Sequence, residues 1–270
     1  MAASLTSRER TRRALLRQDH DRVPRFDQIW PETRQRWRDE GLEADPADAF
    51  EFDLCFMGYL APAPYPGRRD VVAETDTTED VINAYGERLR FFKQRSGTPE
   101  HLAVECDSPQ VWSQRIKPRM TIENAPPPID RLRETCQAGR SGEKFVALCG
   151  RHALMTCQSL LGTEGLFMAM AADPDWVREM ADTFTDLLID WYDAIWHAGI
   201  EPDALWCFDD LAYTQAPFMS EAMYRELFWP SHSRTVRWAH DHGIQYLQHT
   251  DGDVRRFMNL FVEAEMDCLQ

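Results

Sequence analysis

The second half of the chain alternates between short apolar runs and longer segments with helical periodicity. The runs lie at residues 143–150, 202–210 and 244–248, and charge, proline or glycine bounds them, as is typical of buried strands. Between the first two runs, apolar residues recur every three to four positions: Trp176, Met180, Phe184, Leu187, Trp191 and Ile195. This spacing places one apolar stripe on a helix. The alternation predicts parallel βα units.

The first half of the chain is less regular. Its pattern predicts a helix at 5–18, a short strand within 19–30, and a helix from Pro31 to about Gly41. A continuous apolar stretch at 50–60 predicts a buried strand. Residues 69–107 then alternate around a possible turn at Gly86 and predict a hairpin-like excursion from one domain spanning 1–270. With a last run at 266–270, the chain supplies about five strands and the beginning of a sixth.

Composition narrows the classes of function. Acidic residues outnumber basic residues by 45 to 30, so the net charge of -15 repels nucleic acids and anionic membranes. No apolar run reaches the ~18 residues that a membrane span needs. Seven cysteines without a CxxC pair fit a reduced, cytoplasmic protein better than a disulfide framework. We therefore expect a cytoplasmic protein that acts on a small molecule.

Reactive side chains follow four of the predicted strands. In βα folds such positions carry function, because strand ends are rigid whereas loops vary. A barrel brings these positions to one face although they are far apart in the sequence. The candidates are Asp27 and Trp30, Arg151 and His152, Asp209 and Asp210, and His249 and Asp251.

The acidic candidates each have a functional and a structural interpretation. Asp209 and Asp210 can orient a substrate, hold a cation or move a proton, or they can accept backbone N–H groups instead. His249 and Asp251 share one turn with a glycine, which suits a metal site or a histidine oriented by a carboxylate. The alternative is a histidine at the rim and an aspartate that caps the next helix.

Two further interpretations concern helix N-termini. Arg151 and His152 can bind an anion beside free backbone N–H groups, or they can be surface residues. Ser220 precedes "EAMYREL" and is a natural N-cap, which by itself explains its presence. The histidines for which we expect no functional role are those at 20, 101, 197, 232, 240 and 242.

Four stretches of the chain together resemble a known family: "TSRERTRRALLRQDHDRVP", "FVALCGRHALMTCQSLLG", "FDDLAYTQAPFMSEAMYRELFWP" and "HTDGDV". The family is the uroporphyrinogen decarboxylase superfamily, which includes cobalamin-dependent methyltransferases. The resemblance covers most of the chain in the same order, and it implies a (β/α)8 TIM barrel with its site at the C-terminal ends of the strands. Tyr213 and Ser220, in the third stretch, join Asp27, Trp30, Arg151 and His152 as expected substrate-binding residues.

The chain departs from the decarboxylase at three places. The decarboxylase has an arginine-rich first motif that grips substrate carboxylates, whereas "RFDQIWPE" offers Arg25 alone. No acidic residue lies between Asp53 and Asp70, where the family has an aspartate, and the family's pocket tyrosine falls at Gln158. Because an octaanionic porphyrinogen needs compensating cations, decarboxylation is the alternative rather than the favoured reaction.

In the methyltransferase branch, a His-x-Cys pair and a later cysteine hold a zinc ion that activates a thiol toward a corrinoid-bound methyl group. Here His249-Thr250-Asp251 stands in the place of that pair, with aspartate for cysteine. The resemblance therefore implies zinc at His249 and Asp251, with Asp209 or Asp210 completing the catalytic site. It also implies a corrinoid (cobalamin) carried by a partner protein, and methyl transfer between the corrinoid and a small substrate or thiol.

The resemblance implies eight strands, and the chain supplies about six. We therefore expect a barrel truncated after about the sixth strand, with exposed strand edges. A non-catalytic or inactive binding module is the third alternative that this expectation leaves open.

Overall fold

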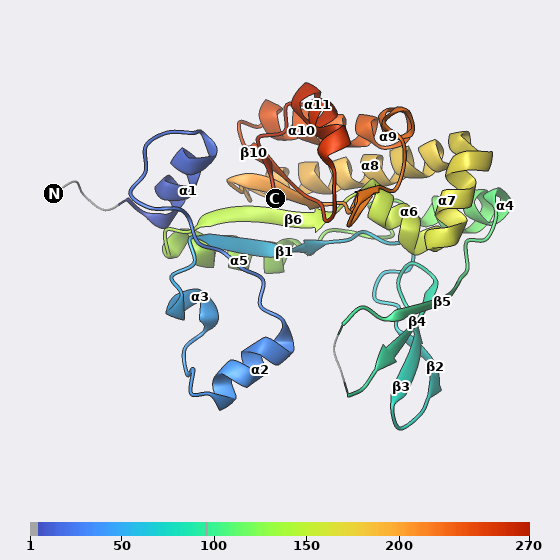
Figure 1. The fold of residues 1–270 in the computed structure, drawn as a ribbon, viewed down its shortest axis with the longest axis horizontal. Coiled ribbons are helices and arrows are strands. Elements are labelled where there is room, and N and C mark those ends of the chain that lie inside the picture. The colour runs from blue at the N-terminus through green and yellow to red at the C-terminus, as the bar shows by residue number, and fades with distance from the viewer. Residues whose placement is uncertain (1–4, 95–96) are drawn as a thin grey trace.

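A central sheet of five parallel strands organises the molecule. The computed structural model describes residues 5–94 and 97–270. The strands lie side by side in the order in which they occur along the chain, as they do in a βα barrel (Figure 1). Their bounds, in that order, are β1 Leu54–Leu60, β6 Phe145–Arg151, β7 Ala204–Phe208, β10 Gln245–His249 and β11 Cys268–Leu269. The architecture is consistent with a TIM-barrel-like fold, although in the described residues no pairing joins the edge strands β1 and β11.

Helices fill the connections between the parallel strands. These helices are α5 Ile129–Ser141, α6 Ala153–Leu161, α7 Thr163–Ala172, α8 Pro174–His197, α9 Glu221–Leu227, α10 Trp229–Asp241, the 3-10 helix η3 Arg255–Phe257 and α11 Met258–Glu263. The apolar stripe expected on α8 is present, since Met180, Phe184 and Ile195 are buried. Among the described residues, no helix is both long enough and apolar enough to cross a membrane.

Side chains of the central strands alternate between two apolar cores. Val146, Leu148 and Leu205 pack with the helices. The residues between them, such as Ala147 and Trp206, form a second core on the opposite face. This second face is the one that would line the interior of a barrel.

The excursion expected at 69–107 is present but is larger than a hairpin. Four antiparallel strands form a separate sheet in the order β2-β3-β4-β5 (Figure 1). Gly86 makes the expected turn with φ +76, a conformation that glycine adopts without a steric penalty. The strands are β2 Asp70–Glu74, β3 Thr78–Ile82, β4 Glu87–Phe92 and β5 Glu100–Val104, followed by α4 Pro109–Val111, the π-helix η1 Trp112–Ile116 and the 3-10 helix η2 Lys117–Arg119.

The prediction of a strand within 19–30 is wrong. Without this strand, the central sheet has five parallel strands instead of the six expected. Residues 23–30 run between α1 (Ser7–Leu15) and α2 (Pro31–Asp39) without regular structure, and α3 (Pro46–Ala49) follows before β1. Pro24 has no N–H to donate, and the N–H of Arg25 donates to the Asp53 carboxylate at 2.7 Å rather than to a strand carbonyl.

Buried Asp53 joins the N-terminal segment to the start of β1. The Arg10 guanidinium donates to Asp53 Oδ1 at 2.7 Å, and Arg22 donates to both carboxylate oxygens, at 2.6 and 3.0 Å. Asp53 is 0% exposed and Arg10 only 5%. Although burial opposes the shift, hydrogen bonds from Arg22, Arg25 and Arg10 lower the pKa of Asp53. The ion pairs therefore hold α1 against the N-terminal end of the sheet.

Removing the Asp53 charge should destabilise the protein strongly. Asp53→Asn leaves two guanidinium groups without their shared carboxylate, and loss of one partner of a buried pair costs about 3–5 kcal/mol. The measurement is the free energy of unfolding in urea. Glu51→Gln is the matched control, because Glu51 pairs with Arg25 at the surface, where a salt bridge is worth about 0–1 kcal/mol.

The same carboxylate sets a dependence of stability on pH. A lowered pKa in the folded state contributes stability above the unfolded pKa of about 3.9, and this contribution is lost as the pH falls through the folded value. The wild type should therefore lose part of its unfolding free energy below about pH 4, a loss that Asp53→Asn should lack. Equal acid sensitivity in both proteins would contradict this assignment.

Candidate functional site

The parallel register of three strands places their last residues side by side. Arg151 of β6 pairs with Phe208 of β7, and Phe208 pairs with His249 of β10. Residues in register on parallel strands point to the same face of the sheet. The three side chains therefore share the face that carries the second apolar core, and the loops after their strands begin at a common edge.

Asp210, His249 and Asp251 form a polar cluster at this edge, which we call the rim cluster. His249 Nε2 lies 3.5 Å from Asp210 Oδ1 and 3.8 Å from Asp251 Oδ1. The side chains of His249 and Asp210 are 21% and 35% exposed, and that of Asp251 is 80% exposed. Two carboxylates and one imidazole thus converge where solvent and small molecules have access.

Backbone contacts hold the two loops of the rim cluster together. The N–H of Asp251 donates to Asp210 Oδ1 at 3.0 Å, and the N–H of Leu211 donates to the Thr250 hydroxyl at 2.9 Å. Gly252 has φ +89, and a Cβ there would lie 2.5 Å from the carbonyl oxygen of Ala212. The glycine of "HTDGDV" is therefore required by the close approach of the loop after β7.

Gln270 fixes the orientation of the His249 ring. His249 Nδ1 lies 2.5 Å from Gln270 Oε1, and the ring packs on Phe208 with centroids 4.8 Å apart. Because an amide oxygen only accepts, Nδ1 carries the proton in this pair. In the neutral imidazole, Nε2 then directs a lone pair toward the carboxylates of Asp210 and Asp251, an arrangement that calls for a cation or a proton between them.

Burial raises the pKa of Asp210. The N–H of Asp251 opposes this shift, the charge of Asp251 adds to it, and His249 lowers the pKa again. The balance leaves a carboxylate that a positive charge would stabilise.

Asp209 points away from the rim cluster into the protein. It is 0% exposed, and its carboxylate accepts the N–H groups of Leu154 and Met155 at 3.1 and 2.7 Å. Asp209 thus satisfies free N–H groups in the first turn of α6. These contacts assign Asp209 a structural position, and its expected catalytic role remains a prediction.

Two buried histidines complete the surroundings of Asp209. His232 Nε2 lies 3.1 Å from Asp209 Oδ2, and His152 Nδ1 lies 3.9 Å from the same atom. The Thr235 hydroxyl donates to the carbonyl of His232 and so accepts from His152 Nε2 at 3.0 Å. Burial, followed by the charges of His232 and Arg234, lowers the pKa of His152, which is therefore neutral. His232 was among the histidines for which we expected no role, because it lies 80 residues beyond His152, on α10, and no pattern in the sequence links the two.

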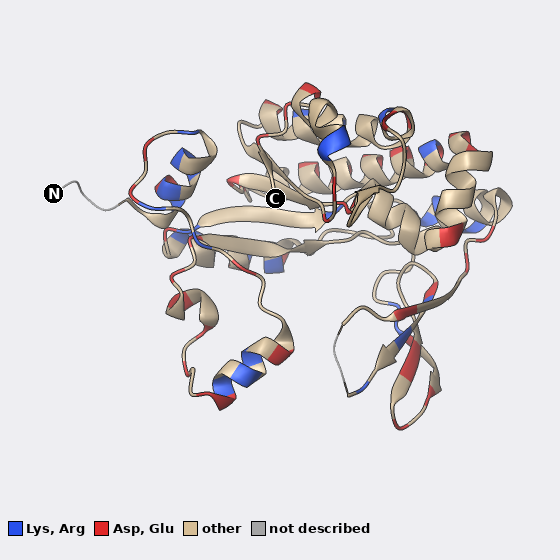
Figure 2. Cartoon of the chain, viewed as in Figure 1, with Lys and Arg blue, Asp and Glu red and all other residues tan. Residues whose placement is uncertain are grey.

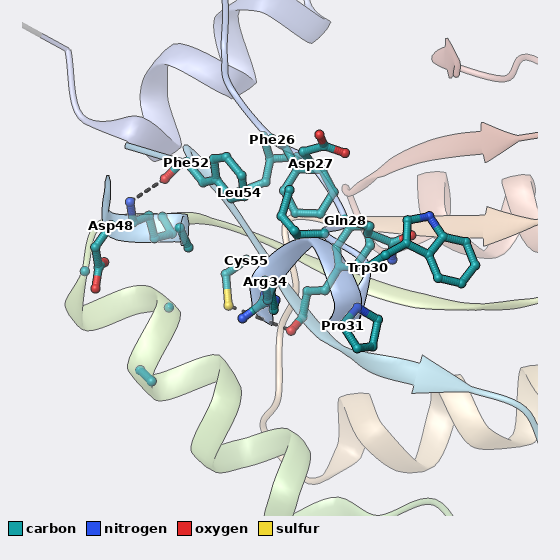
Figure 3. Close-up of a pocket in the computed structure, with 17 residues that line it drawn as sticks. Phe26, Asp27, Gln28, Trp30, Pro31, Arg34, Asp48, Phe52, Leu54 and Cys55 are labelled. Atoms are coloured by element: carbon teal, nitrogen blue, oxygen red, sulfur yellow. Dashed lines mark hydrogen bonds between the residues drawn. The ribbon is translucent and has the colours of Figure 1, made fainter. Parts of the chain in front are cut away.

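Asp27 and Trp30 lie away from the rim cluster because the strand expected before them is absent. They line a cavity of about 790 Å³ (Figure 3), together with Phe56 and Ala138. The lining also contains Leu54, which is the first residue of β1, and Lys144, which directly precedes β6. The cavity is therefore at the opposite end of these strands from Arg151 and His249.

Tyr213 and Ser220 also contribute no side chain to the rim cluster. Tyr213 is 68% exposed in the short strand β8 (Ala212–Tyr213), which pairs with β9 (Ala216–Pro217). The Ser220 hydroxyl accepts the N–H of Met223 at 3.2 Å, which confirms it as the N-cap of α9. Binding of substrate by either residue remains a prediction.

Comparison with known proteins supports the fold. No family model matches the chain, and neither does any curated protein. A solved structure, a methyltransferase from Methanosarcina mazei, is similar to it with a TM-score of 0.59 and 14% sequence identity. The superposition covers 98% of this chain and 76% of that chain. At this identity the likeness establishes a shared fold and does not by itself transfer a reaction.

The two neighbouring aspartates should respond differently to substitution. Asp209→Ala leaves the buried N–H groups of Leu154 and Met155 without their acceptor, which should lower the free energy of unfolding by about 3 kcal/mol or more. Asp210→Asn, at the partly exposed rim, should change it by less than about 1 kcal/mol. Urea unfolding of both variants measures the difference. An Asp209→Ala protein as stable as the wild type would contradict the structural role of Asp209.

Proposed function

We propose that the chain is a methyltransferase-like enzyme whose rim cluster binds a zinc ion and, through it, a small thiol. The observation that carries this proposal is the orientation of His249. Its Nδ1 is occupied by Gln270, so its free Nε2 faces two carboxylates. A metal-binding histidine usually donates its other N–H to an oxygen acceptor in this way.

The donor atoms of the rim cluster fit a small divalent ion. A tetrahedral zinc ion with bonds of about 2.1 Å separates its ligands by about 3.4 Å. The distances from His249 Nε2 to the carboxylates, 3.5 and 3.8 Å, are close to this separation. One nitrogen and two oxygen donors leave a fourth position for a substrate, as in catalytic rather than structural zinc sites.

The methyltransferase likeness and the sequence resemblance suggest the chemistry. A zinc ion bound there would lower the pKa of a coordinated thiol and keep it as the reactive thiolate. Asp251 would have one carboxylate oxygen on the zinc ion and, because its side chain is 80% exposed, the other oxygen free to accept the proton that the thiol loses. A methyl-corrinoid carried by a partner protein would supply the methyl group, and Asp210, His249 and Asp251 would hold the thiolate sulfur at the rim, where it could accept that group.

Decarboxylation of a porphyrinogen is less well supported. Arg25, the one arginine in the segment that resembles the substrate-gripping motif, pairs with Glu51 at the opposite end of the sheet. A polyanionic substrate would leave its carboxylates unpaired beside the acidic rim cluster, at a large free-energy cost. A non-catalytic binding module is the remaining alternative, and the metal and transfer measurements below separate it from an enzyme.

Zinc should bind stoichiometrically and depend on the rim cluster. Protein purified without chelators should contain about one zinc per chain by elemental analysis, and His249→Ala should lose it because it removes the nitrogen donor. Asp210→Asn should weaken zinc binding by about tenfold or more, because loss of even an outer-shell partner of a metal site costs about 10–100-fold in affinity. Asp253→Asn is the control, since Asp253 lies in the same loop but pairs with Arg255.

The transfer step has its own readout. When methylcobalamin is mixed anaerobically with 2-mercaptoethanol and the zinc-loaded protein, its visible spectrum should change to that of the demethylated corrinoid. With His249→Ala, this change should occur only at the uncatalysed rate. Wild-type protein that contains no metal, even after incubation with zinc, would contradict the metal site. Protein that binds zinc without transferring the methyl group would keep the site and contradict the corrinoid reaction.

A further inference from the structure

Arg151 is an isolated charge in the central sheet. Among the residues of β1, β6, β7, β10 and β11, all of which the structure describes, it is the single lysine, arginine, aspartate or glutamate. The central strands are accordingly almost entirely tan, the colour of uncharged residues, in Figure 2. Arg151 is the last residue of β6 and is in register with Phe208 of β7. His249 is in register with Phe208 on the other side, so Arg151 and His249 are two strands apart.

No carboxylate compensates Arg151. In the described part of the chain, no acidic oxygen lies within 4.0 Å of its guanidinium, whereas buried Arg10 contacts two aspartates. One Nη of Arg151 donates to the Ser159 hydroxyl at 3.0 Å. Its Nε is buried and has no hydrogen-bond partner.

Aromatic rings enclose the guanidinium without neutralising it. Its central carbon lies 4.8 Å from the centroid of the Tyr85 ring, within the range of a cation–π contact. Burial raises the pKa of Tyr85 and of Tyr59, so both phenols are uncharged at neutral pH. The phenolic oxygens of Tyr85 and Tyr59 also stabilise the charge of the guanidinium. The two tyrosines therefore provide shape and neutral polar contacts, but no counter-charge.

The missing counter-charge is informative because the chain has acids to spare. A largely enclosed cation without a partner is costly, and this protein carries 45 acidic residues against 30 basic ones. An ordinary structural arginine at this place would be expected to have a carboxylate neighbour. A ligand that brings its own oxyanion would supply what the fold omits.

We propose that Arg151 forms an oxyanion subsite with the ring of Tyr85 as one wall, and that the substrate is a small molecule bearing a carboxylate or a similar anionic group. This inference rests on the proposed function for the identity of the reacting group at the rim cluster. Adjacent strands are about 4.8 Å apart, so Arg151 and His249, two strands apart, have backbones separated by about 10 Å. Phe208 lies between them and provides an apolar floor for the short chain that links the anion to the reacting group.

The subsite can be tested without metal and without turnover. The probes are sodium propionate and inorganic phosphate, with propionamide as the neutral analogue of propionate, titrated into metal-free full-length protein. The readout is the side-chain Nε–H signal of Arg151 in nitrogen-15 NMR spectra, assigned by its absence in Arg151→Lys. At least one anion should shift this signal saturably, and propionamide should leave it unchanged.

Two substitutions identify the group responsible. Arg151→Gln, followed through the signals of neighbouring backbone amides, should weaken anion binding by tenfold or more, because a charge-assisted hydrogen bond is lost. Arg151→Lys keeps the positive charge and should retain part of the affinity. It tests the role of the charge if Arg151→Gln does not fold. Arg225→Gln is the control, since Arg225 makes an exposed pair with Glu263.

Each outcome decides between the alternatives. Saturation by propionate assigns a carboxylate, and saturation by phosphate alone assigns a phosphorylated ligand, with the subsite supported in both cases. Equal binding of propionamide and propionate, or equal anion affinity in the wild type and Arg151→Gln, would overturn the proposal. Because the protein is metal-free in these titrations, their result is independent of whether zinc binds at His249.

Discussion

The in-register pairing of three parallel strands is the constraint on which the candidate site depends. It places Arg151, Phe208 and His249 in one row on one face, although about 100 residues separate the first from the last. A shift of one residue in any of these strands would turn its terminal side chain to the helix-covered face. The buried pattern of the strands opposes such a shift, because it would also exchange the two apolar cores. The packing of the sheet and the geometry of the site are therefore maintained by the same register.

Burial then divides the charged groups into two kinds. Asp53 and Asp209 are fully enclosed, and guanidinium or backbone N–H groups donate hydrogen bonds to their oxygens, which offsets the cost of burying a carboxyl group. Asp210 is only partly enclosed, and burial raises its pKa. Arg151 lacks a counter-ion in the described structure. A ligand would gain binding free energy by pairing with these two groups, because the described part of the fold provides no opposite charge for them.

The antiparallel excursion contributes a side chain to the proposed subsite, although it is an insertion outside the central sheet. Tyr85, in the turn between β3 and β4, is 6% exposed and covers the Arg151 guanidinium. The excursion thus supplies one wall of the proposed subsite. Loops and insertions at the C-terminal ends of barrel strands commonly set specificity in this way, since they can vary without changing the sheet.

By itself, the sequence determined the elements with strong periodicity. Apolar runs and one long amphipathic stripe predicted β6, β7, β10 and α8, because these patterns follow directly from the geometry of a strand and a helix. Gly86 at the turn of the excursion and Ser220 at the N-cap of α9 were also predictable, because both depend only on the residues next to them in the sequence. Only the tertiary structure decided which polar residues meet. It replaced the strand expected before Asp27 with a segment held by Asp53, it buried Asp209 against His152 and His232, and it brought Gln270 to His249. Those contacts join residues tens of positions apart, and no local pattern records them, because each depends on how the strands pair and on what the helices leave exposed.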